Sequence, residues 1–293
     1  MSAIKIGISG WRYPPWRGVF YPKGLKQDRE LEFASHALPS IEINGSFYNL
    51  QRPENYSNWY AATPKGFVFS VKAPRYITHI LRLRDVKIPV ANFFASGLFN
   101  LQEKLGPILW QFPPSFKFDA ELFEEFLALL PRDTEAAHAL ASAYHEHVKG
   151  RAQLDFDKNR RIRHAVEIRN ASFIDPQFIA LLRKYNVALV VADTAKKWPY
   201  YEDITSDFMY LRLHGEAELY ASGYTDAALQ RWANRIRVWR DGGQVADAHR
   251  IDSKVHSKDK RRTKRPIFCY FDNDIKVRAP FDAAALIELL KKS

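Results

Sequence analysis

The chain is poor in cysteine and has no long apolar run. Cys269 is the single cysteine among 293 residues, so no disulfide can form within the chain, and we expect a reducing compartment. The apolar stretches are far shorter than the roughly 18–20 residues of a membrane helix, so we expect no membrane partner. Met1–Lys5 lead directly into a strand pattern and leave no room for the apolar core of a signal peptide. Together these absences predict a cytoplasmic protein.

Several motifs that identify enzymes are also missing. There is no phosphate-binding P-loop, no glycine-rich dinucleotide fingerprint and no Gly-x-Ser-x-Gly nucleophile elbow, so a nucleotide cofactor is not expected. Neither His-x-x-x-His nor a cysteine pair occurs, and the sequence therefore holds no compact metal-binding motif. A site for a divalent metal, built from dispersed acidic and histidine side chains, stays open.

Acidic residues are in deficit. The chain has 44 lysine and arginine residues against 33 aspartate and glutamate residues, a formal net charge of +11. Much of the excess lies between His249 and Arg265, where eight basic residues stand against two aspartates. A basic surface favours an anionic partner, either a nucleic acid or an anionic small molecule. The same segment fits a solvated loop that keeps the protein soluble. The sequence leaves both interpretations open and does not indicate an oligomeric state.

Eight short runs rich in valine, isoleucine and phenylalanine are typical of strands. Many are apolar throughout, which indicates strands buried on both faces, as in a parallel sheet. The runs are Ile4–Ser9, Ser40–Gly45, Phe67–Lys72, Ile108–Phe112, Ala165–Ile168, Ala188–Ala192, Phe208–Leu213 and Ile267–Phe271.

Helical patterns lie between most of these runs. Asp119 is an expected N-cap, and Asp175 followed by Pro176 places a cap and an N1 proline at another helix start. Asp282 is the expected cap of the last helix. Eight alternations of strand and helix predict an α/β fold, and that number favours a closed TIM-type (β/α)8 barrel.

The length suits one such barrel with additions. A TIM barrel typically takes about 250 residues. We predict a single domain over residues 1–293, with insertions at about 132–163 and 246–266.

Four of the predicted strands end in two polar residues spaced i, i+2, which share one face of a strand. The pairs are Glu42 and Asn44, Glu167 and Arg169, Arg212 and His214, and Asp272 and Asp274. Lys72 and Gln111 end two further strands. In a TIM barrel the carboxyl ends of the strands form the active site, so we expect these side chains to converge at the barrel mouth.

Each of these residues receives an expected role. We predict Glu42 and Glu167 as general acid and base, because a carboxyl group beside a cation in a partly apolar pocket can be tuned toward neutral pH. Lys72 and His214 complete the predicted catalytic group, Lys72 as an electrostatic residue and His214 as a proton relay. The predicted substrate-binding residues are Trp11, Asn44, His79, Gln111, Arg169, Asp193, Arg212, Tyr220, Tyr224 and Asp272.

Within this set we expect cations to clamp an anion and aromatic rings to stack. Arg169 and Arg212 would bind a phosphate or carboxylate together with Lys72, and Trp11, Tyr220 and Tyr224 would stack on a sugar or base. The alternative is a structural network of ion pairs without catalytic function. It would pair Glu42 with Lys72, Glu167 with Arg169 or Arg212, and Asp193 with His214.

Taken together, several motifs resemble one protein family. They are GISGWRYPPWRGVFYP, EINGSFY, FVFSVKAPRYITH, KLGPILWQFPPSF, VEIRNASF, YLRLHG, LYASGY and CYFDNDIKVRAPFDA, and they span Ile4 to about Leu290. In this order they are similar to the domain-of-unknown-function-72 (YecE-like) family. Two positions depart from the family pattern: Asp272, where Asn is frequent, and Asp282.

The resemblance implies a TIM-type barrel, similar to the xylose-isomerase-like group that includes metal-dependent apurinic endonucleases. We therefore carry three hypotheses. The first is an enzyme, a hydrolase or lyase, acting on an anionic substrate that contains a sugar or nucleotide. The second is a non-catalytic nucleic-acid-binding protein that uses residues 250–265. The third is a metal-dependent phosphoesterase, with metal ligands drawn from His79, Glu167, Asp193, His214 and Asp272.

Overall fold

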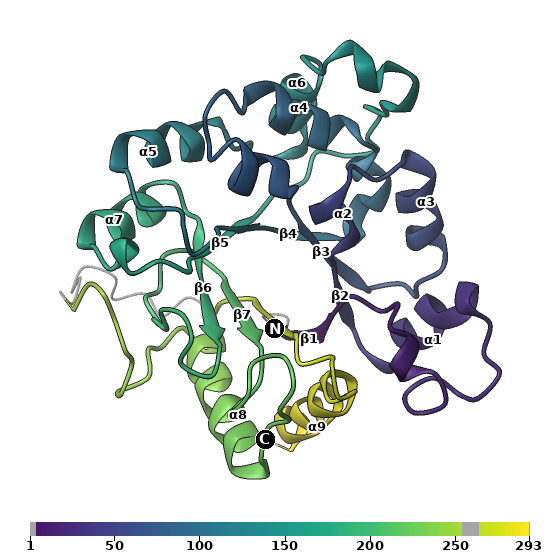
Figure 1. Ribbon diagram of the computed structural model, residues 1–293, viewed down its shortest axis with the longest axis vertical. Coiled ribbons are helices and arrows are strands. Elements are labelled where there is room, and N and C mark those ends of the chain that lie inside the picture. Colours follow the sequence, from purple (N-terminus) through teal and green to yellow (C-terminus); the bar gives the residue numbers. More distant parts are fainter. Residues whose placement is uncertain (1–3, 254–263, 293) are drawn as a thin grey trace.

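The computed structural model describes residues 4–253 and 264–292. Its eight strands are all parallel and close into a barrel in the order β1 to β8, because β8 pairs with both β7 and β1. The predicted TIM-type barrel is thereby confirmed (Figure 1). The strands are β1 Ile4–Ser9, β2 Ser40–Ile43, β3 Val68–Lys72, β4 Leu105–Gln111, β5 His164–Glu167, β6 Ala188–Asp193, β7 Met209–Leu213 and β8 Ile267–Phe271.

The helices surround the barrel on its outside (Figure 1). They are α1 Glu30–Ala37, α2 Gly45–Tyr48, α3 Pro53–Ala61, α4 Lys87–Ala95, α5 Ala120–Leu129, α6 Thr134–Ala141, α7 Pro176–Lys184, α8 Asp226–Arg240 and α9 Ala279–Lys291. Within residues 4–253 and 264–292, no helix combines the length and the apolar character that crossing a bilayer would require.

Two of the predicted helix caps are confirmed and one is wrong. The side chain of Asp119 accepts a hydrogen bond from the backbone of α5, and that of Asp175 does the same for α7. The last helix begins at Ala279, so Asp282 lies inside it. Its carboxylate instead accepts from Asn273 Nδ2 at 2.8 Å and from the Tyr224 amide at 3.2 Å. The prediction failed because a tertiary partner, and not the helix backbone, uses this carboxylate.

The two faces of the strands differ in what they contact. Outward side chains such as Ile8, Ile41 and Trp110 pack in the large core between barrel and helices. A smaller cluster that includes Leu109, Val190 and Tyr270 fills the barrel interior. Because successive residues of a strand point to opposite faces, the last inward positions of several strands meet at one end of the barrel. These positions carry the polar residues of the mouth.

The predicted insertion at 132–163 contains α6, which packs against α4. Its two ends form a short antiparallel bridge, with the Ile162 amide donating to Arg132 O at 2.8 Å and the Thr134 amide to Arg160 O at 2.9 Å.

Part of the second insertion, including five basic residues of segment 249–265, lies outside the described residues. At the described end of this segment, Arg265 is tied to the end of α8. Its Nη1 donates to Gly243 O at 3.2 Å.

Candidate functional site

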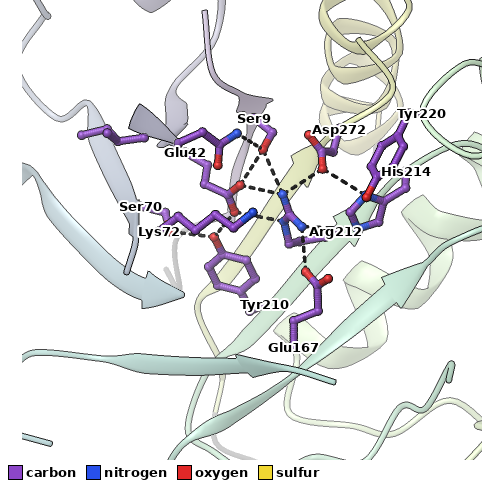
Figure 2. Close-up of polar contacts among 12 residues, drawn as sticks. Ser9, Glu42, Ser70, Lys72, Glu167, Tyr210, Arg212, His214, Tyr220 and Asp272 are labelled. Carbon is purple, nitrogen blue, oxygen red and sulfur yellow. Dashed lines mark hydrogen bonds and ion pairs between the residues drawn. The ribbon is translucent and has the colours of Figure 1, made fainter. Parts of the chain in front are cut away.

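A single guanidinium group occupies the centre of the barrel mouth. Arg212, at the end of β7, is 1% exposed. Its Nη2 and Nε donate to the two carboxylate oxygens of Glu42 at 2.9 and 3.2 Å. Its Nη1 donates to Glu167 at 2.7 Å, and Nη2 also reaches Asp272 at 2.9 Å (Figure 2). Three carboxylates from three strand ends therefore share one buried cation.

The barrel register explains why these groups meet. Ser9 pairs with Glu42 across β1 and β2, and Glu42 pairs with Ser70 across β2 and β3. On the other side Gln111 pairs with Glu167 across β4 and β5. Parallel strands in register bring side chains of equal height together, so polar residues far apart in the chain form one layer.

Besides the guanidinium, two hydroxyl groups hold Glu42, and each of them has a further partner. Ser9 Oγ donates to Glu42 Oε1 at 2.5 Å, and Tyr210 OH donates to Oε2 at 2.6 Å. The hydroxyls of Tyr210 and Ser70 lie 2.6 Å apart, and Asn44 Nδ2 donates to Ser9 Oγ at 2.8 Å. Glu42 is fully buried, and these bonds satisfy both of its oxygens. The layer is therefore fixed in place before any ligand enters.

The charges of this network stabilise one another. Burial alone would raise the pKa of Glu167, but Arg169 and Arg212 outweigh it and hold that pKa well below its usual range. Burial is likewise outweighed at Asp272, where Arg212 and His214 keep the pKa low. At Arg212 the carboxylates overcome the effect of burial and raise the pKa. The two carboxylates stay ionised at neutral pH.

His214 lies beside this network with its imidazole fully buried. Its Nε2 is 3.4 Å from Arg212 Nη1, which can only donate, so we assign the ring proton to Nδ1. Nδ1 lies 3.0 Å from Asp272 Oδ2. The contact has the distance of an ion pair, but Nδ1 makes no well-aligned hydrogen bond.

Lys72 has a different environment. It ends β3, is 9% exposed, and its ammonium stands 4.1 Å above the ring of Phe47. Among residues 4–253 and 264–292 this ammonium has no hydrogen-bonding or ion-pairing partner. Burial and then the positive charge of Arg212 lower the pKa of Lys72 to about 8, against the opposite effect of Glu42 and Glu167. Lys72 is a buried cation with unused donors.

Arg169, two residues beyond Glu167, is the third cation of the site. Its Nε donates to Glu167 Oε1 at 2.8 Å, and its guanidinium lies 3.7 Å from the centre of the Trp198 ring. Nη2 also reaches the hydroxyl of Tyr220 at 3.3 Å. Stacking on an aromatic face and a carboxylate along one edge hold the guanidinium in one plane. Tyr220, with a positive φ of 63°, covers His214 from the loop after β7.

The remaining predicted residues lie around this centre. Gln111 is 5% exposed beside Glu167, and its amide makes no hydrogen bond to the described part of the chain. His79 packs edge-on against Phe47, and burial, then Lys72, lower its pKa to about 4. Asp193 accepts a hydrogen bond from Tyr224 OH at 3.1 Å and is not bonded to the carboxylates around Arg212 in the described part of the chain.

Trp11 and Asn44 open onto a neighbouring pocket of about 660 Å³ that is partly open to solvent. Trp11 packs edge-on against Trp59, which also lines it. Asn44 Oδ1 is buried and accepts no hydrogen bond from residues 4–253 or 264–292. The pocket is lined by Gly10, Trp11, Arg12, Tyr13, Ile43, Asn44, Gly45, Gln51 and Trp59.

The structure thus brings together most, but not all, of the pairs expected from the sequence. Glu167 contacts both Arg169 and Arg212. Among the described residues, Glu42 forms an ion pair with Arg212 and not with Lys72. The Asp193 carboxylate bonds to Tyr224 and forms no ion pair with His214, although the His214 amide donates to the Asp193 carbonyl at 2.8 Å. Asp272 takes the place next to His214 instead.

Two residues of this site were not predicted from the sequence. Tyr210 supports Glu42 from inside the barrel, and extending the alternation of Arg212 and His214 two residues backward would have found it. Trp198, under the Arg169 guanidinium, lies in a loop after β6 where no pattern indicates which side chain turns inward.

The metal ligands suggested by the sequence do not form a metal site. Among the residues that the structure describes, no three histidine, cysteine or acidic side chains are placed to hold one ion. Glu167 is bonded to Arg169 and Arg212, and Asp193 to Tyr224. Because a guanidinium already stands among the carboxylates, the donor set does not fit a cation.

Fold and site define a TIM-type barrel whose mouth carries a buried arginine–carboxylate network. The model of the family described as "Protein of unknown function DUF72" matches residues 5–293, so this chain belongs to that family. The resemblance inferred from the motifs is confirmed.

Known relatives agree with the family and the fold. UPF0759 protein YunF of Bacillus subtilis (strain 168) is 33% identical over 118 residues, which make up 39% of this chain and 41% of YunF. The matched part is less than half of that relative. A DUF72 family protein from Thermotoga maritima MSB8 shares the fold with a TM-score of 0.70 at 25% identity, covering 99% of each chain. One from Enterococcus faecalis V583 reaches 0.68 at 16% identity, covering 99% of this chain and 96% of the other.

Proposed function

We propose that this protein is an enzyme that binds a small anionic substrate, containing a sugar or nucleotide, at the C-terminal mouth of the barrel. One observation carries the proposal: Lys72 is a buried ammonium that forms no hydrogen bond or ion pair with the described residues, although Glu42, Glu167 and Asp272 are near enough to raise its pKa. An unpaired buried charge is costly to a fold. A substrate phosphate or carboxylate would pair with this ammonium. It would bind more tightly because the free energy needed to bury the charge is already part of folding.

The neighbours of Lys72 suggest how such a substrate is held. Arg169 keeps one edge of its guanidinium on Glu167 and its face on Trp198, which leaves further donors for an anion. Gln111 offers an amide that makes no bond to the described chain. Trp11 and the adjoining pocket suit the flat apolar face of a sugar or base.

We assign Arg212 a role that differs from the anion clamp expected from the sequence. Its donors are directed at three carboxylates and Ser9, so a ligand anion would compete with them. We propose that Arg212 organises the carboxylates, while Lys72 and Arg169 bind the anion.

The proposed chemistry is proton transfer at neutral pH. Glu167 and Asp272 remain ionised, so they suit the stabilisation of positive charge or acceptance of a proton better than acid catalysis. Lys72, with its pKa at about 8, suits the donation of a proton. A hydrolase or lyase needs this combination of donor and acceptor.

The test measures ligand-induced stabilisation. Wild type is heated with ribose 5-phosphate, glucose 6-phosphate or AMP, and with the unphosphorylated counterpart of each. A ligand present at 100 times its dissociation constant stabilises the fold by about 2.7 kcal/mol. We expect phosphorylated ligands to raise the melting temperature of wild type, and Lys72→Met to reduce that rise. Lys87→Met, on the exposed start of α4, is the control.

Two outcomes would contradict the proposal. One is an equal shift with phosphorylated and unphosphorylated ligands. The other is a shift of unchanged size in Lys72→Met, which would place any bound phosphate elsewhere.

A further inference from the structure

A second group of cations lies at the opposite end of the barrel, where the strands begin. Arg163 immediately precedes β5, and Asn186 lies just before β6. Together with the ends of α5 and α7 they surround a pocket of about 610 Å³, part of it open to solvent. Its lining consists of Arg132, Arg161, Ile162, Arg163, Lys184, Tyr185 and Asn186. We call these residues the lower basic pocket.

The backbone holds the three arginines close together. The Ile162 amide bonds to Arg132 O, and Asp133 and Arg161 form an antiparallel bridge. The preceding residue, Pro131, is fixed as well, because its carbonyl lies 2.7 Å from Nε2 of the fully buried His164. Hydrogen bonds of the backbone around Arg132 and around Arg161 and Arg163 therefore hold the three arginines near one another.

Counter-charges in this pocket cover only part of the positive charge. Arg161 is paired with Asp207, and Lys184 with Glu124 at 2.5 Å. Arg132 and Arg163 form no ion pair with the described residues. The pocket thus keeps two guanidinium groups that form no ion pair with the described chain, although the charge of Asp207 acts on Arg163 from a distance.

Both of these guanidinium groups are partly withdrawn from water. Arg132 lies 5.7 Å from the centre of the Tyr185 ring and gives one bond to Leu127 O, and Arg163 lies 5.9 Å from the centre of the Phe208 ring. Arg163 Nε is buried and finds no hydrogen-bond acceptor in the part of the chain that the structure describes. Burial, and then the nearby charge of Arg161, lower the pKa of both arginines, yet both stay charged because arginine does not deprotonate in proteins.

From this geometry we infer that the lower basic pocket is a binding site for a phosphate group, distinct from the barrel mouth. Planar guanidinium groups match the oxygens of phosphate, and two of them can bind it with several charge-assisted hydrogen bonds. Arg163 Nε is buried, so the donors offered to such a ligand are the other N–H groups of the two guanidinium groups. A concave site of this size suits the phosphate of a small molecule better than the extended backbone of a nucleic acid.

Calorimetric titration with inorganic phosphate at constant ionic strength tests the inference. We expect wild type to bind, and Arg163→Gln to bind at least about tenfold more weakly, because it removes a charge-assisted hydrogen bond and a charge. Arg132→Gln combined with Arg163→Gln should bind no phosphate here. If the double variant unfolds, Arg163→Gln alone still tests the inference. The Arg163 side chain donates no hydrogen bond to the described residues, so its replacement should leave the fold intact.

Matched controls separate this site from the mouth and from general charge. Arg29→Gln with Lys87→Gln removes two exposed charges elsewhere and should leave affinity unchanged. Lys72→Met should keep binding at the lower basic pocket. Three results would overturn the inference: no phosphate binding by wild type at millimolar concentration, loss of all binding in Lys72→Met alone, or displacement of phosphate by an oligonucleotide but not by a small phosphomonoester.

Discussion

At the scale of single residues, Arg212 decides the chemistry of the mouth. Its contacts to Glu167 and Asp272 leave these two carboxylates ionised in a place that water hardly reaches, and it also bonds to Glu42. A buried pair contributes little net stability over an apolar replacement, but removal of one partner leaves an uncompensated charge. Arg212 therefore adds little net stability of its own. Without it, however, three acidic residues could not occupy one buried layer.

Replacement of Arg212 by methionine tests this dependence. We expect the free energy of unfolding at pH 7 to fall by about 3–5 kcal/mol, because three buried carboxylates lose their cation. Glu167 and Asp272 have depressed pKa values in the fold, so their contribution is present above the unfolded-state pKa, near 4, and is lost as pH falls. The deficit of the variant should therefore shrink below about pH 4.

Urea denaturation from pH 3 to 8 provides the measurement. Arg29→Met, in the exposed pair with Glu32, is the control and should cost less than about 1 kcal/mol at any pH. An Arg212→Met protein as stable as the Arg29→Met control would show that the network has no such dependence.

Lys72 predicts a pH dependence of ligand binding. With the pKa lowered to about 8, the ammonium is mostly charged at pH 7 and mostly neutral at pH 9. Affinity for a phosphomonoester at the mouth should therefore fall as pH rises through about 8, approaching tenfold per unit above it. Titrations from pH 7 to 9.5 measure this, since the ligand itself keeps its charge over that range.

The matched variant is Lys72→Arg. Its guanidinium stays charged throughout, so affinity should be flat with pH even if its absolute value is lower. An identical fall in wild type and Lys72→Arg would assign the titration to another group.

The sequence predicts this site unevenly, for physical reasons. The i, i+2 pairs identified Glu42, Glu167 and Arg212, because strand alternation fixes which side chains share a face. Partner choice was not predictable: the lysine expected beside Glu42 instead stands over Phe47, since register and side-chain length decide the contact. Trp198 was missed because loop conformation follows no simple period.

At the scale of elements, strand positions followed from apolar runs with errors of a few residues. Predicted Ser40–Gly45 is β2 Ser40–Ile43, and predicted Ile108–Phe112 is β4 Leu105–Gln111. Caps were predictable where the side chain has only its own helix to bond, as for Asp119. Asp282 failed because a distant amide and Asn273 claim its carboxylate.

The cap of α5 gives a prediction at this scale. Asp119→Ala removes the acceptor that holds the Leu122 amide at 3.2 Å, and we expect a loss of about 1 kcal/mol in unfolding free energy. Glu125→Ala, at an exposed position within the same helix, should change stability little. Urea denaturation compares the two variants, and equal effects would show that the cap has no special role.

At the scale of the whole molecule, closure depends on the last strand. β8 bonds to β7 and to β1, so a chain ending at residue 265 would lack β8 and α9 and expose two strand edges. We expect this truncated chain to aggregate or to lose cooperative unfolding. A chain that lacks only residues 291–293 should stay folded. Gel filtration and urea denaturation distinguish them, and a soluble, cooperatively folding truncated chain would argue against a single folding unit.

The net charge of +11 carries the proposal of nucleic-acid binding. Most of the basic residues of segment 249–265 lie outside the described residues, so this proposal rests on the sequence. We expect affinity for single-stranded DNA to fall by about 0.7 log units per decade of salt for each phosphate neutralised. Replacement of Lys258, Lys260, Arg261 and Arg262 by serine should reduce that slope. A flat salt response in wild type would reject nucleic-acid binding through this segment.

The layered construction of the mouth has a consequence for how new specificities arise in such a barrel. Tyr210 and Ser9 are bonded into the Arg212 network, whereas the side chains of Lys72 and Gln111 form no hydrogen bond or ion pair with it among the described residues. On the proposed function, substitutions at Lys72 and Gln111 should change which ligand binds, while the network around Arg212 keeps its geometry. In such a barrel the proposed ligand recognition can therefore change through the exchange of a few side chains while the buried network stays intact.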